Sequence, residues 1–442
     1  MYVSTRVPAV TSQVIAVRPG RPLSGTVTVD GSKNAALPLV AAAAALLRPV
    51  RLDNVPASSD VQTLLDLLRQ AGWNTAHPVG DDQTVLVLPR EAAPMPDGLG
   101  EAASGIRASY YLVPALIALC GRARLPWPGG CRIGDRGMEQ HFKVYEAFGD
   151  RVRVDDHGYV VEAGKAVRGT VSLALPFRSR GATIAAVLRA MVAGTPLRLG
   201  QPNLSPEVLG VLNALMAVGY ECRAGERVLT LAPPSSVSEE DVPVWKVPGD
   251  KIEAGTLACA VAATGGNARI EGVHGPDVAP LVAALHRMGI PTAGESKTLV
   301  VHGRETQPTG RPLRAMATLA PGGLDADFEP SLLGLALGFP GTHLFSDPIN
   351  PGRHSNLIPQ LVRMGGDITE LSATECRFTG PQRLTGAGVE ATDIRTGSAL
   401  MVAGLTARGV TTLGGVDQIR RGHADLPGKL LALGADICEV TP

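Results

Sequence analysis

A segment running from Pro128 to Arg136 combines one thiol with two arginines, in the order Pro-Gly-Gly-Cys-Arg-Ile-Gly-Asp-Arg. Glycine and proline oppose both helices and central strands, so we expect a loop here. Guanidinium groups near Cys131 favour its thiolate form, which is the nucleophile. The alternative is an inert thiol, because free cysteine is among the most buried residue types. The loop alone does not decide between a reactive and a buried cysteine.

Charged residues recur near the polar starts of six Ala- and Leu-rich segments that are expected to be buried helices. These starts lie near Ser32, Gly105, Arg180, Asp250, Asp325 and Asp393. The cations at or close to them are Lys33, Arg107, Arg178, Arg180, Lys251 and Arg395. Helix N-termini bind anions through free N–H groups and the helix dipole. Each cation taken singly fits a solvated surface charge, but their recurrence predicts an anion site where the helix starts converge.

Three further residues each have a catalytic or binding interpretation and a purely structural one. Asp325 is either a general base or an N-cap. Arg421 is either a phosphate ligand or an ordinary loop arginine, and His141 is equally ambiguous. The chain has no GxGxxG after a strand, no Walker loop and no HExxH, and its six cysteines lack metal-ligand spacing. We therefore expect no redox cofactor and no metal.

Composition limits the partners. Lys+Arg and Asp+Glu are equal at 41 each, so no global field attracts nucleic acid or an anionic membrane. Lys33 is the only lysine in the first 142 residues, so we do not expect it to be merely a solvated surface charge. Scattered cysteines, no secretory signal and no apolar run long enough for a bilayer predict a soluble cytoplasmic protein.

A unit of strand, apolar helix, strand, second helix and two strands recurs six times. Each second helix ends at a glycine, which suits a left-handed C-cap. These glycines are Gly72, Gly149, Gly219, Gly289, Gly365 and Gly434, spaced 69 to 77 residues apart. Three units per domain predict two α/β domains, 33–248 and 1–32 plus 249–442. The hinge is expected in the proline-rich segment 242–248.

At this point several short segments together resemble UDP-N-acetylglucosamine enolpyruvyl transferase. They are Gly-Ser-Lys-Asn-Ala-Ala-Leu-Pro (31–38), Ile-Arg-Ala-Ser (106–109), Pro-Gly-Gly-Cys (128–131), Ile-Gly (133–134), Asp-Lys-Ile-Glu (250–253), Thr-Asp-Ile-Arg (392–395) and Arg-Gly (421–422). The match is collinear over nearly the whole chain. The resemblance implies two inside-out α/β barrel domains, each of three βαβαββ repeats, with the active site in the cleft between them.

The resemblance also implies a reaction, namely transfer of the enolpyruvyl group of phosphoenolpyruvate to a hydroxyl. Phosphoenolpyruvate is then a co-substrate, and no cofactor is needed. The residues implied to hold it are Lys33, Asn34, Arg107, Arg136 and Arg421. Clamped cations offset the charges of phosphate and carboxylate and orient the reacting carbon.

Catalytic roles follow from the same resemblance. Asp325 takes the proton of the acceptor hydroxyl. Cys131 protonates the phosphoenolpyruvate methylene and can form a covalent adduct. Lys33 belongs to the catalytic set, and Asp393 and Arg395 handle protons or support the site. Closure of the domains brings the cysteine loop down and excludes water.

Departures from the family pattern concentrate in the acceptor half. Gly137-Met138-Glu139 follows the loop arginine, Ser179-Arg180-Gly181 replaces a Ser-Val-Gly run, and the residues at 203–207 and before Asp325 also differ. The predicted acceptor residues are Arg178, Ser179, Arg180, Gly181, His141 and Asp325. Two added arginines suit a terminal monophosphate. We therefore favour the 3′-hydroxyl of UMP, as in relatives of peptidyl-nucleoside antibiotic pathways, over UDP-N-acetylglucosamine of the cell-wall reaction.

Other readings remain. The related shikimate-3-phosphate enolpyruvyl transferase lacks the Pro-Gly-Gly-Cys loop, and an RNA-cyclase relative would need a glycine-rich signature. A non-catalytic nucleotide-binding paralogue would predict loss of Lys33, Cys131, Asp325 or Arg421, and all four are present. The expected partners are phosphoenolpyruvate and a uridine nucleotide, with no nucleic acid or membrane, in a monomer or weak homo-oligomer.

Overall fold

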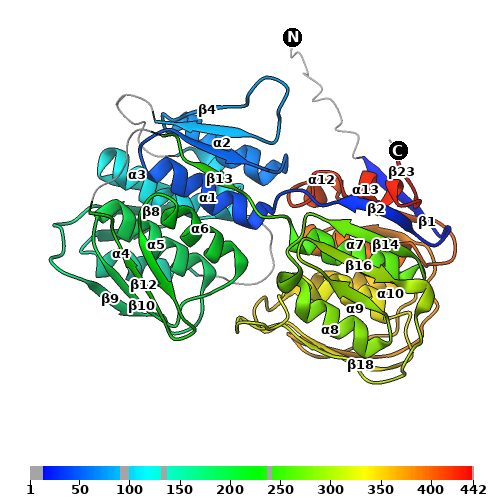
Figure 1. Cartoon of the computed structure of the whole chain (residues 1–442). Helices are drawn as coiled ribbons and strands as arrows, with labels where there is room; N and C mark the ends of the chain where they lie inside the picture. Colours follow the sequence, from blue (N-terminus) through cyan, green and yellow to red (C-terminus); the bar gives the residue numbers. More distant parts are fainter. Residues whose placement is uncertain (1–12, 90–98, 131–136, 236–240, 441–442) are drawn as a thin grey trace, which may run out of the picture.

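The computed structural model describes residues 13–89, 99–130, 137–235 and 241–440. Two lobes are visible in Figure 1. Each lobe has its own hydrophobic core, one built from residues 35–247 and the other from 15–29 together with 252–437. Within the described ranges, no helix combines the length and apolarity needed to cross a bilayer.

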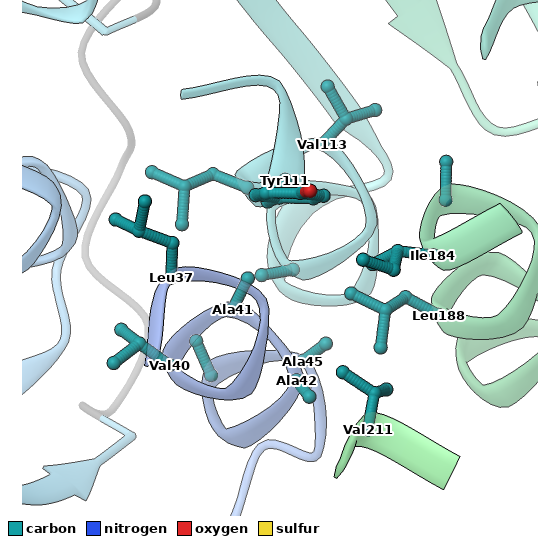
Figure 2. Packing of buried hydrophobic residues seen from close by; sticks show 14 of the residues in the cluster. Leu37, Val40, Ala41, Ala42, Ala45, Tyr111, Val113, Ile184, Leu188 and Val211 are labelled. Atoms are coloured by element: carbon teal, nitrogen blue, oxygen red, sulfur yellow. The ribbon is translucent and has the colours of Figure 1, made fainter. Parts of the chain in front are cut away.

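Three helices lie at the centre of each lobe and contact one another. In the first lobe they are α1 (Lys33–Ala45), α3 (Val113–Cys120) and α5 (Arg180–Ala193). In the second they are α7 (Lys251–Ala263), α9 (Glu329–Ala336) and α11 (Ile394–Gly404). They are apolar on almost every side, as a fully enclosed helix must be. Figure 2 shows α1 packed against Ile184 and Leu188 of α5 and Val211 of the next helix.

Amphipathic outer helices cover these central helices. They are α2 (Ser59–Gln70), α4 (Glu139–Ala147), α6 (Pro206–Met216), α8 (Ala279–Met288), α10 (Arg353–Arg363), α12 (Val416–Arg420) and α13 (Leu426–Ala432). Short 3₁₀ turns are η1 (Glu101–Ser104), η2 (Arg107–Leu112), η3 (Gly275–Val278) and η4 (Gly303–Glu305). The six glycines predicted to end the second helices all have φ between 81° and 102°, so that prediction is confirmed.

The described strands of the first lobe form three separate sheets. In spatial order these are β13 (Val244–Lys246), β3 (Val50–Asp53), β5 (Val85–Leu88), β4 (Asn74–Ala76); β6 (Arg122–Pro126), β8 (Gly158–Glu162), β7 (Arg151–Asp155); and β11 (Glu221–Ala224), β12 (Val228–Ala232), β10 (Leu197–Gly200), β9 (Val171–Ala174). The last of these belongs to one complete β-α-β-α-β-β unit, in which β9 and β10 are parallel and the rest antiparallel.

The described strands of the second lobe form three more sheets. These are β15 (Thr292–Gly294), β16 (Thr298–His302), β14 (Asn267–Glu271), β2 (Ser24–Thr28); β17 (Arg314–Met316), β18 (Gly341–Ser346), β20 (Glu375–Gly380), β19 (Thr369–Ser372); and β21 (Gly388–Glu390), β22 (Thr411–Gly414), β1 (Val14–Arg18), β23 (Asp436–Val440). The predicted α/β repeat fold is confirmed. Among the described residues, the strands form six separate sheets that surround the central helices, and none of these sheets closes into a barrel.

The two lobes exchange one strand each. β2 precedes α1 in the chain but pairs in parallel with β14, and β13 precedes α7 but pairs in parallel with β3. The two crossing segments touch at an antiparallel bridge between Gly31 and Gly249. A Cβ on Gly31 would lie 1.8 Å from the carbonyl oxygen of Asn54, so only glycine fits at this crossing. The crossing places the starts of α1 and α7 next to each other.

Two central helices begin later than the sequence indicates. The helix predicted at Asp325 begins at Glu329 as α9, and the one predicted near Gly105 begins as the 3₁₀ turn η2 before α3. The carboxylate of Asp325 accepts a hydrogen bond from the N–H of Asp327 at 3.0 Å. Such a local turn competes with helix formation, and it leaves both aspartates ahead of the helix rather than in it.

Candidate active site

A cavity of about 750 Å³ lies between the lobes and takes its walls from both. Its volume falls in the ordinary range for small-molecule sites. The predicted site residues that line it are Lys33, Asn34, Arg107, His141, Ser179, Arg180, Gly181, Asp325, Asp393, Arg395 and Arg421. Cys131 and Arg136 lie outside the described residues. The helix starts thus converge at one place.

At one end of the cavity, Asp60 joins two of the predicted phosphate ligands. The ammonium of Lys33 lies 3.2 Å from one oxygen of Asp60, and Nε of Arg421 lies 2.9 Å from the other. Lys33 starts α1 and Asp60 lies in the first turn of α2, whereas Arg421 follows α12 of the second lobe. Arg421 also donates to the carbonyl of Gly105 at 3.4 Å. Asp60 therefore fixes cations from both lobes at the same spot.

Arg107 lies beside this end. It begins η2, and its guanidinium donates to the carbonyl of Gly137 at 3.4 Å and lies 6.0 Å from the ring centre of Tyr110. These contacts hold the half-buried cation at the cavity wall. Its charge also acts on the His141 ring.

The start of α5 forms another part of the wall. Ser179 caps this helix by accepting a hydrogen bond from the N–H of Ala182 at 3.2 Å. A Cβ on Gly181 would lie 2.6 Å from Nε2 of His141 and 2.7 Å from the hydroxyl of Tyr110, so close approach demands glycine here. The His141 ring is 4% exposed, and neither of its nitrogens has a hydrogen-bond partner among the described residues. Burial, reinforced by Arg107, lowers the pKa of His141 to about 3, so the ring is neutral.

Four alternating charges, which we call the cleft quartet, bridge the lobes. Lys251 lies 2.8 Å from Asp325 and 3.5 Å from Glu207, and Arg180 lies 3.3 Å from Asp325 and 3.5 Å from Glu207. Arg180 begins α5 and Glu207 lies in the first turn of α6, both in the first lobe, while Lys251 and Asp325 belong to the second. Burial alone would raise the pKa of Asp325, but Lys251 and Arg180 outweigh it and lower the pKa to about 2.

Asp327 organises a second charged group on the same wall. Its carboxylate oxygens lie 2.9 Å from Nη2 of Arg353 and 3.0 Å from Nη2 of Arg395. The side-chain amide of Asn34 reaches across from the first lobe, at 3.4 Å. Burial alone would raise the pKa of Asp327, yet Arg395 and Arg353 hold it well below its usual range. Arg395 also donates to Nε2 of His423 at 3.0 Å.

Asp393 caps α11. Its carboxylate accepts hydrogen bonds from the N–H groups of Arg395 and Thr396, at 2.9 and 3.1 Å, and from the Thr396 hydroxyl at 2.6 Å. Although Asp393 reaches the cavity wall, its acceptor capacity is largely used by its own helix. Its described contacts are those of a cap that orients Arg395.

Arg178 is the predicted site residue that the structure does not bring to the cavity wall. Its guanidinium donates to the carbonyls of Glu226 and Pro202, at 2.8 and 3.4 Å. These bonds fasten the loop before α5 to two neighbouring loops. Of the two added arginines, Arg180 alone therefore faces the cavity, and it already faces two carboxylates. This weakens the argument that two free guanidinium groups await a monophosphate.

Several residues of the site were missed by the sequence analysis. They are Asp60, Glu207, Asp327, Arg353 and His423. None of these residues except His423 stands in a motif that indicates a functional role. His423 lies two residues after Arg421, within the segment that contains that motif. Lys251 is one of the predicted cations at a helix start. Within the described ranges no group of three His, Cys, Asp or Glu side chains is arranged to hold a metal ion.

Chemically, the cavity wall carries the cations Lys33 and Arg421, the ionised carboxylate of Asp325 and the start of α5. Such an arrangement can hold a small polyanion and accept a proton from a neighbouring hydroxyl. Together with the six-unit bilobal fold, it is the arrangement expected of an enolpyruvyl transferase.

Comparison with known proteins supports this class. Residues 17–430 match the family described as EPSP synthase (3-phosphoshikimate 1-carboxyvinyltransferase), and the chain belongs to this family. It is 36% identical over 429 residues to UDP-N-acetylglucosamine 1-carboxyvinyltransferase 3 of Symbiobacterium thermophilum, covering 96% of this chain and 97% of that protein. It is 34% identical over 430 residues to UDP-N-acetylglucosamine 1-carboxyvinyltransferase 1 of Halalkalibacterium halodurans, covering 96% and 94%.

The crystal structure of the enolpyruvyl transferase NikO from Streptomyces tendae superposes with a TM-score of 0.83 at 26% identity, covering 98% of this chain and 99% of that one. The predicted family resemblance and the predicted enolpyruvyl transferase activity are thus confirmed.

Proposed function

We propose that the protein transfers the enolpyruvyl group of phosphoenolpyruvate to a hydroxyl of a uridine nucleotide and releases phosphate. The observation that carries this proposal is the meeting of Lys33 and Arg421 from opposite lobes at Asp60, in the same cavity as the ionised Asp325. Phosphoenolpyruvate is a small polyanion that matches such a cluster of cations. The chemistry is that of the family to which the chain belongs.

The roles assigned to the residues follow the reaction. Lys33, Asn34, Arg107, Arg136 and Arg421 hold phosphoenolpyruvate. Asp325 accepts the hydroxyl proton as the acceptor oxygen bonds to C2, while Cys131 gives a proton to C3. Loss of a methyl proton then expels phosphate and restores the double bond as an enol ether. Arg395, oriented by the Asp393 cap, supports charge and proton movements beside the reacting carbon.

For the acceptor we favour the 3′-hydroxyl of UMP. The start of α5, with Ser179, Arg180, Gly181 and neutral His141, offers N–H groups and one guanidinium to a nucleotide phosphate. The second candidate is UDP-N-acetylglucosamine, favoured by relatives of that activity at 34% and 36% identity.

A phosphate-release assay with phosphoenolpyruvate and each of UMP, UDP-N-acetylglucosamine and shikimate 3-phosphate separates these candidates. Release with UMP alone supports our choice. Release with UDP-N-acetylglucosamine but not UMP replaces it by the cell-wall reaction. No release with any of the three, from enzyme that still binds phosphoenolpyruvate, favours a non-catalytic nucleotide-binding paralogue.

The role of Cys131 has its own test. Fosfomycin, a mimic of phosphoenolpyruvate, should add covalently to Cys131 and raise the intact mass by one inhibitor equivalent. The Cys131→Ser variant should stay unmodified, and Cys120→Ser, which removes an exposed cysteine elsewhere, should react like the unaltered enzyme. Absence of an adduct with and without nucleotide would remove Cys131 from the mechanism.

A further inference from the structure

Of the two cations in the cleft quartet, Arg180 is held less closely than Lys251. Its closest carboxylate oxygen is at 3.3 Å and its next at 3.5 Å, whereas Lys251 holds Asp325 at 2.8 Å. Nε of Arg180 is buried and makes no hydrogen bond among the described residues, although Oε2 of Glu207 lies 3.5 Å away as an ion-pair partner. A buried charged donor without a hydrogen bond is costly. A phosphate is the kind of ligand that a guanidinium fork satisfies.

The surroundings of Arg180 provide a place for that phosphate. Arg180 is the first residue of α5, whose opening N–H groups lie at the cavity wall beside Ser179 and Gly181. His141, buried and without hydrogen-bond partners, directs Nε2 at Gly181. Arg180 therefore lies between two alternatives, namely the catalytic carboxylate Asp325 across the cleft and an anion at its own helix start.

We propose that Arg180 couples recognition of the acceptor to release of the catalytic base. In the empty site Arg180 pairs with Asp325. When the acceptor's phosphate binds at the start of α5, Arg180 turns to it and leaves Asp325 to Lys251 and the incoming hydroxyl. Arg180 then determines specificity, because an acceptor without a phosphate at this position does not free the base. The inference rests on the proposed function and assigns to Arg180 a specificity-determining role in its acceptor site.

A population argument gives the expected size. If Arg180 is engaged with Asp325 in about 90% of empty molecules, the apparent dissociation constant of the nucleotide is raised about tenfold over that of the free guanidinium. Removing the charge of Asp325 should remove this competition and leave Arg180 only its longer contact with Glu207, at 3.5 Å. The nucleotide should then bind more tightly, although a catalytic group has been removed.

The test is a double-mutant cycle on UMP affinity, measured by calorimetry without phosphoenolpyruvate. We expect Asp325→Asn to lower the dissociation constant about tenfold and Arg180→Gln to raise it about tenfold or more. In the Arg180→Gln background, Asp325→Asn should have almost no effect. Equal effects of Asp325→Asn in both backgrounds would overturn the proposal, because general electrostatic repulsion would then explain them.

Controls distinguish the exchange of Arg180 between Asp325 and the phosphate from loss of folding and from failure of the proposed function. Uridine, which lacks the phosphate, should bind all four proteins equally weakly, and Arg198→Met should measure the loss of an exposed arginine from the same lobe. Unaltered thermal unfolding should show that each variant is folded. If the unaltered enzyme binds UDP-N-acetylglucosamine but not UMP, UMP is ruled out as the acceptor. The double-mutant cycle is then measured with UDP-N-acetylglucosamine. If the unaltered enzyme binds neither, the proposed function and this inference both fail.

Discussion

The guanidinium of Arg395 has two acceptors, one on each side. Asp327 binds one nitrogen at 3.0 Å and Nε2 of His423 binds another at 3.0 Å. Burial, together with Arg395 and neighbouring lysines, keeps the pKa of His423 well below its usual range. A neutral ring with an unprotonated Nε2 is the form that can accept from Arg395. His423 is therefore expected to aim Arg395 without reaching the cavity itself.

Substitutions at His423 test this positioning. We expect His423→Leu, which removes the acceptor, to lower kcat about tenfold with little change in the KM for phosphoenolpyruvate, because a lost hydrogen bond to a charged group costs about 1.5 kcal/mol or more. His423→Gln keeps an acceptor oxygen and should recover most of kcat. Phosphate-release kinetics make the comparison. If Leu and Gln are equally impaired, the ring serves packing rather than positioning.

Motif residues of the site were predictable from the sequence, but their partners were not. Lys33, Arg107, Asp325 and Arg421 stand in recognisable local patterns, and the structure brings them to one cavity. Asp60 lies 361 residues from Arg421, and Asp327 meets Asn34 from the opposite lobe. Such partners depend on how distant elements approach, which no local pattern encodes.

Among the elements, the crossing segments have the tightest fit. Gly31→Ala would place a methyl group 1.8 Å from a backbone oxygen of Asn54, so a strand must shift. We expect a loss of about 2–4 kcal/mol in the free energy of unfolding. Gly210→Ala in α6 meets no atom within 4 Å and should instead gain about 0.5–1 kcal/mol. Urea unfolding of both variants measures the difference, and similar values would show that the crossing tolerates a side chain.

Glu253 connects α7 to the same crossing. Its carboxylate accepts from Lys429 of α13 at 2.6 Å and from the N–H of Asp30 at 2.9 Å. Burial raises the pKa of Glu253 to about 7, against the opposing effect of Lys429. The folded pKa therefore lies above the unfolded value. Its stabilising contribution is complete below about pH 4 and is lost as the pH rises through 7.

The corresponding prediction concerns the pH dependence of stability. Unfolding in urea at pH 5 and pH 8 isolates the Glu253 contribution as a difference between proteins, because the buried neutral rings of His141 and His423 change stability in the opposite direction in every variant. Glu253→Gln, which has no proton to lose and keeps an acceptor for Asp30, should therefore gain stability relative to the unaltered protein when the pH is raised from 5 to 8. Asp66→Asn, at an exposed pair in α2, should leave the pH dependence as it is. Equal slopes for all three proteins would contradict a titrating Glu253.

The repeat itself was the most predictable part of the fold. Glycine positions and apolar helices depend on local backbone and burial preferences, and these preferences agree with the structure at all six glycines. The sequence did not predict that β2 and β13 pair with strands of the opposite lobe, because the sequence of a strand does not determine which strand it pairs with. The late start of α9 was missed because the Asp325 turn imitates a helix cap.

Polar contacts, rather than an apolar interface, hold the cleft in the form described. Among the described residues, Asp60–Arg421, Arg180–Asp325 and Glu207–Lys251 all cross from one lobe to the other. The two hydrophobic cores remain separate. An interface of charges opens at modest cost, since water replaces its contacts. The lobes are therefore expected to separate when these ion pairs are removed, while each core stays folded.

Small-angle scattering of an Asp60→Asn/Glu207→Gln double variant, which removes two of these three ion pairs, tests this expectation. A compact chain of this length has a radius of gyration of about 22 Å, and opening of the cleft should add roughly 1 Å. Asp66→Asn, an exposed pair within one lobe, should cause no increase. Phosphoenolpyruvate with nucleotide should shrink the unaltered protein less than the double variant, because only the latter begins open. An unchanged radius in the double variant, with normal circular dichroism, would show that the crossing segments alone set the angle between the lobes.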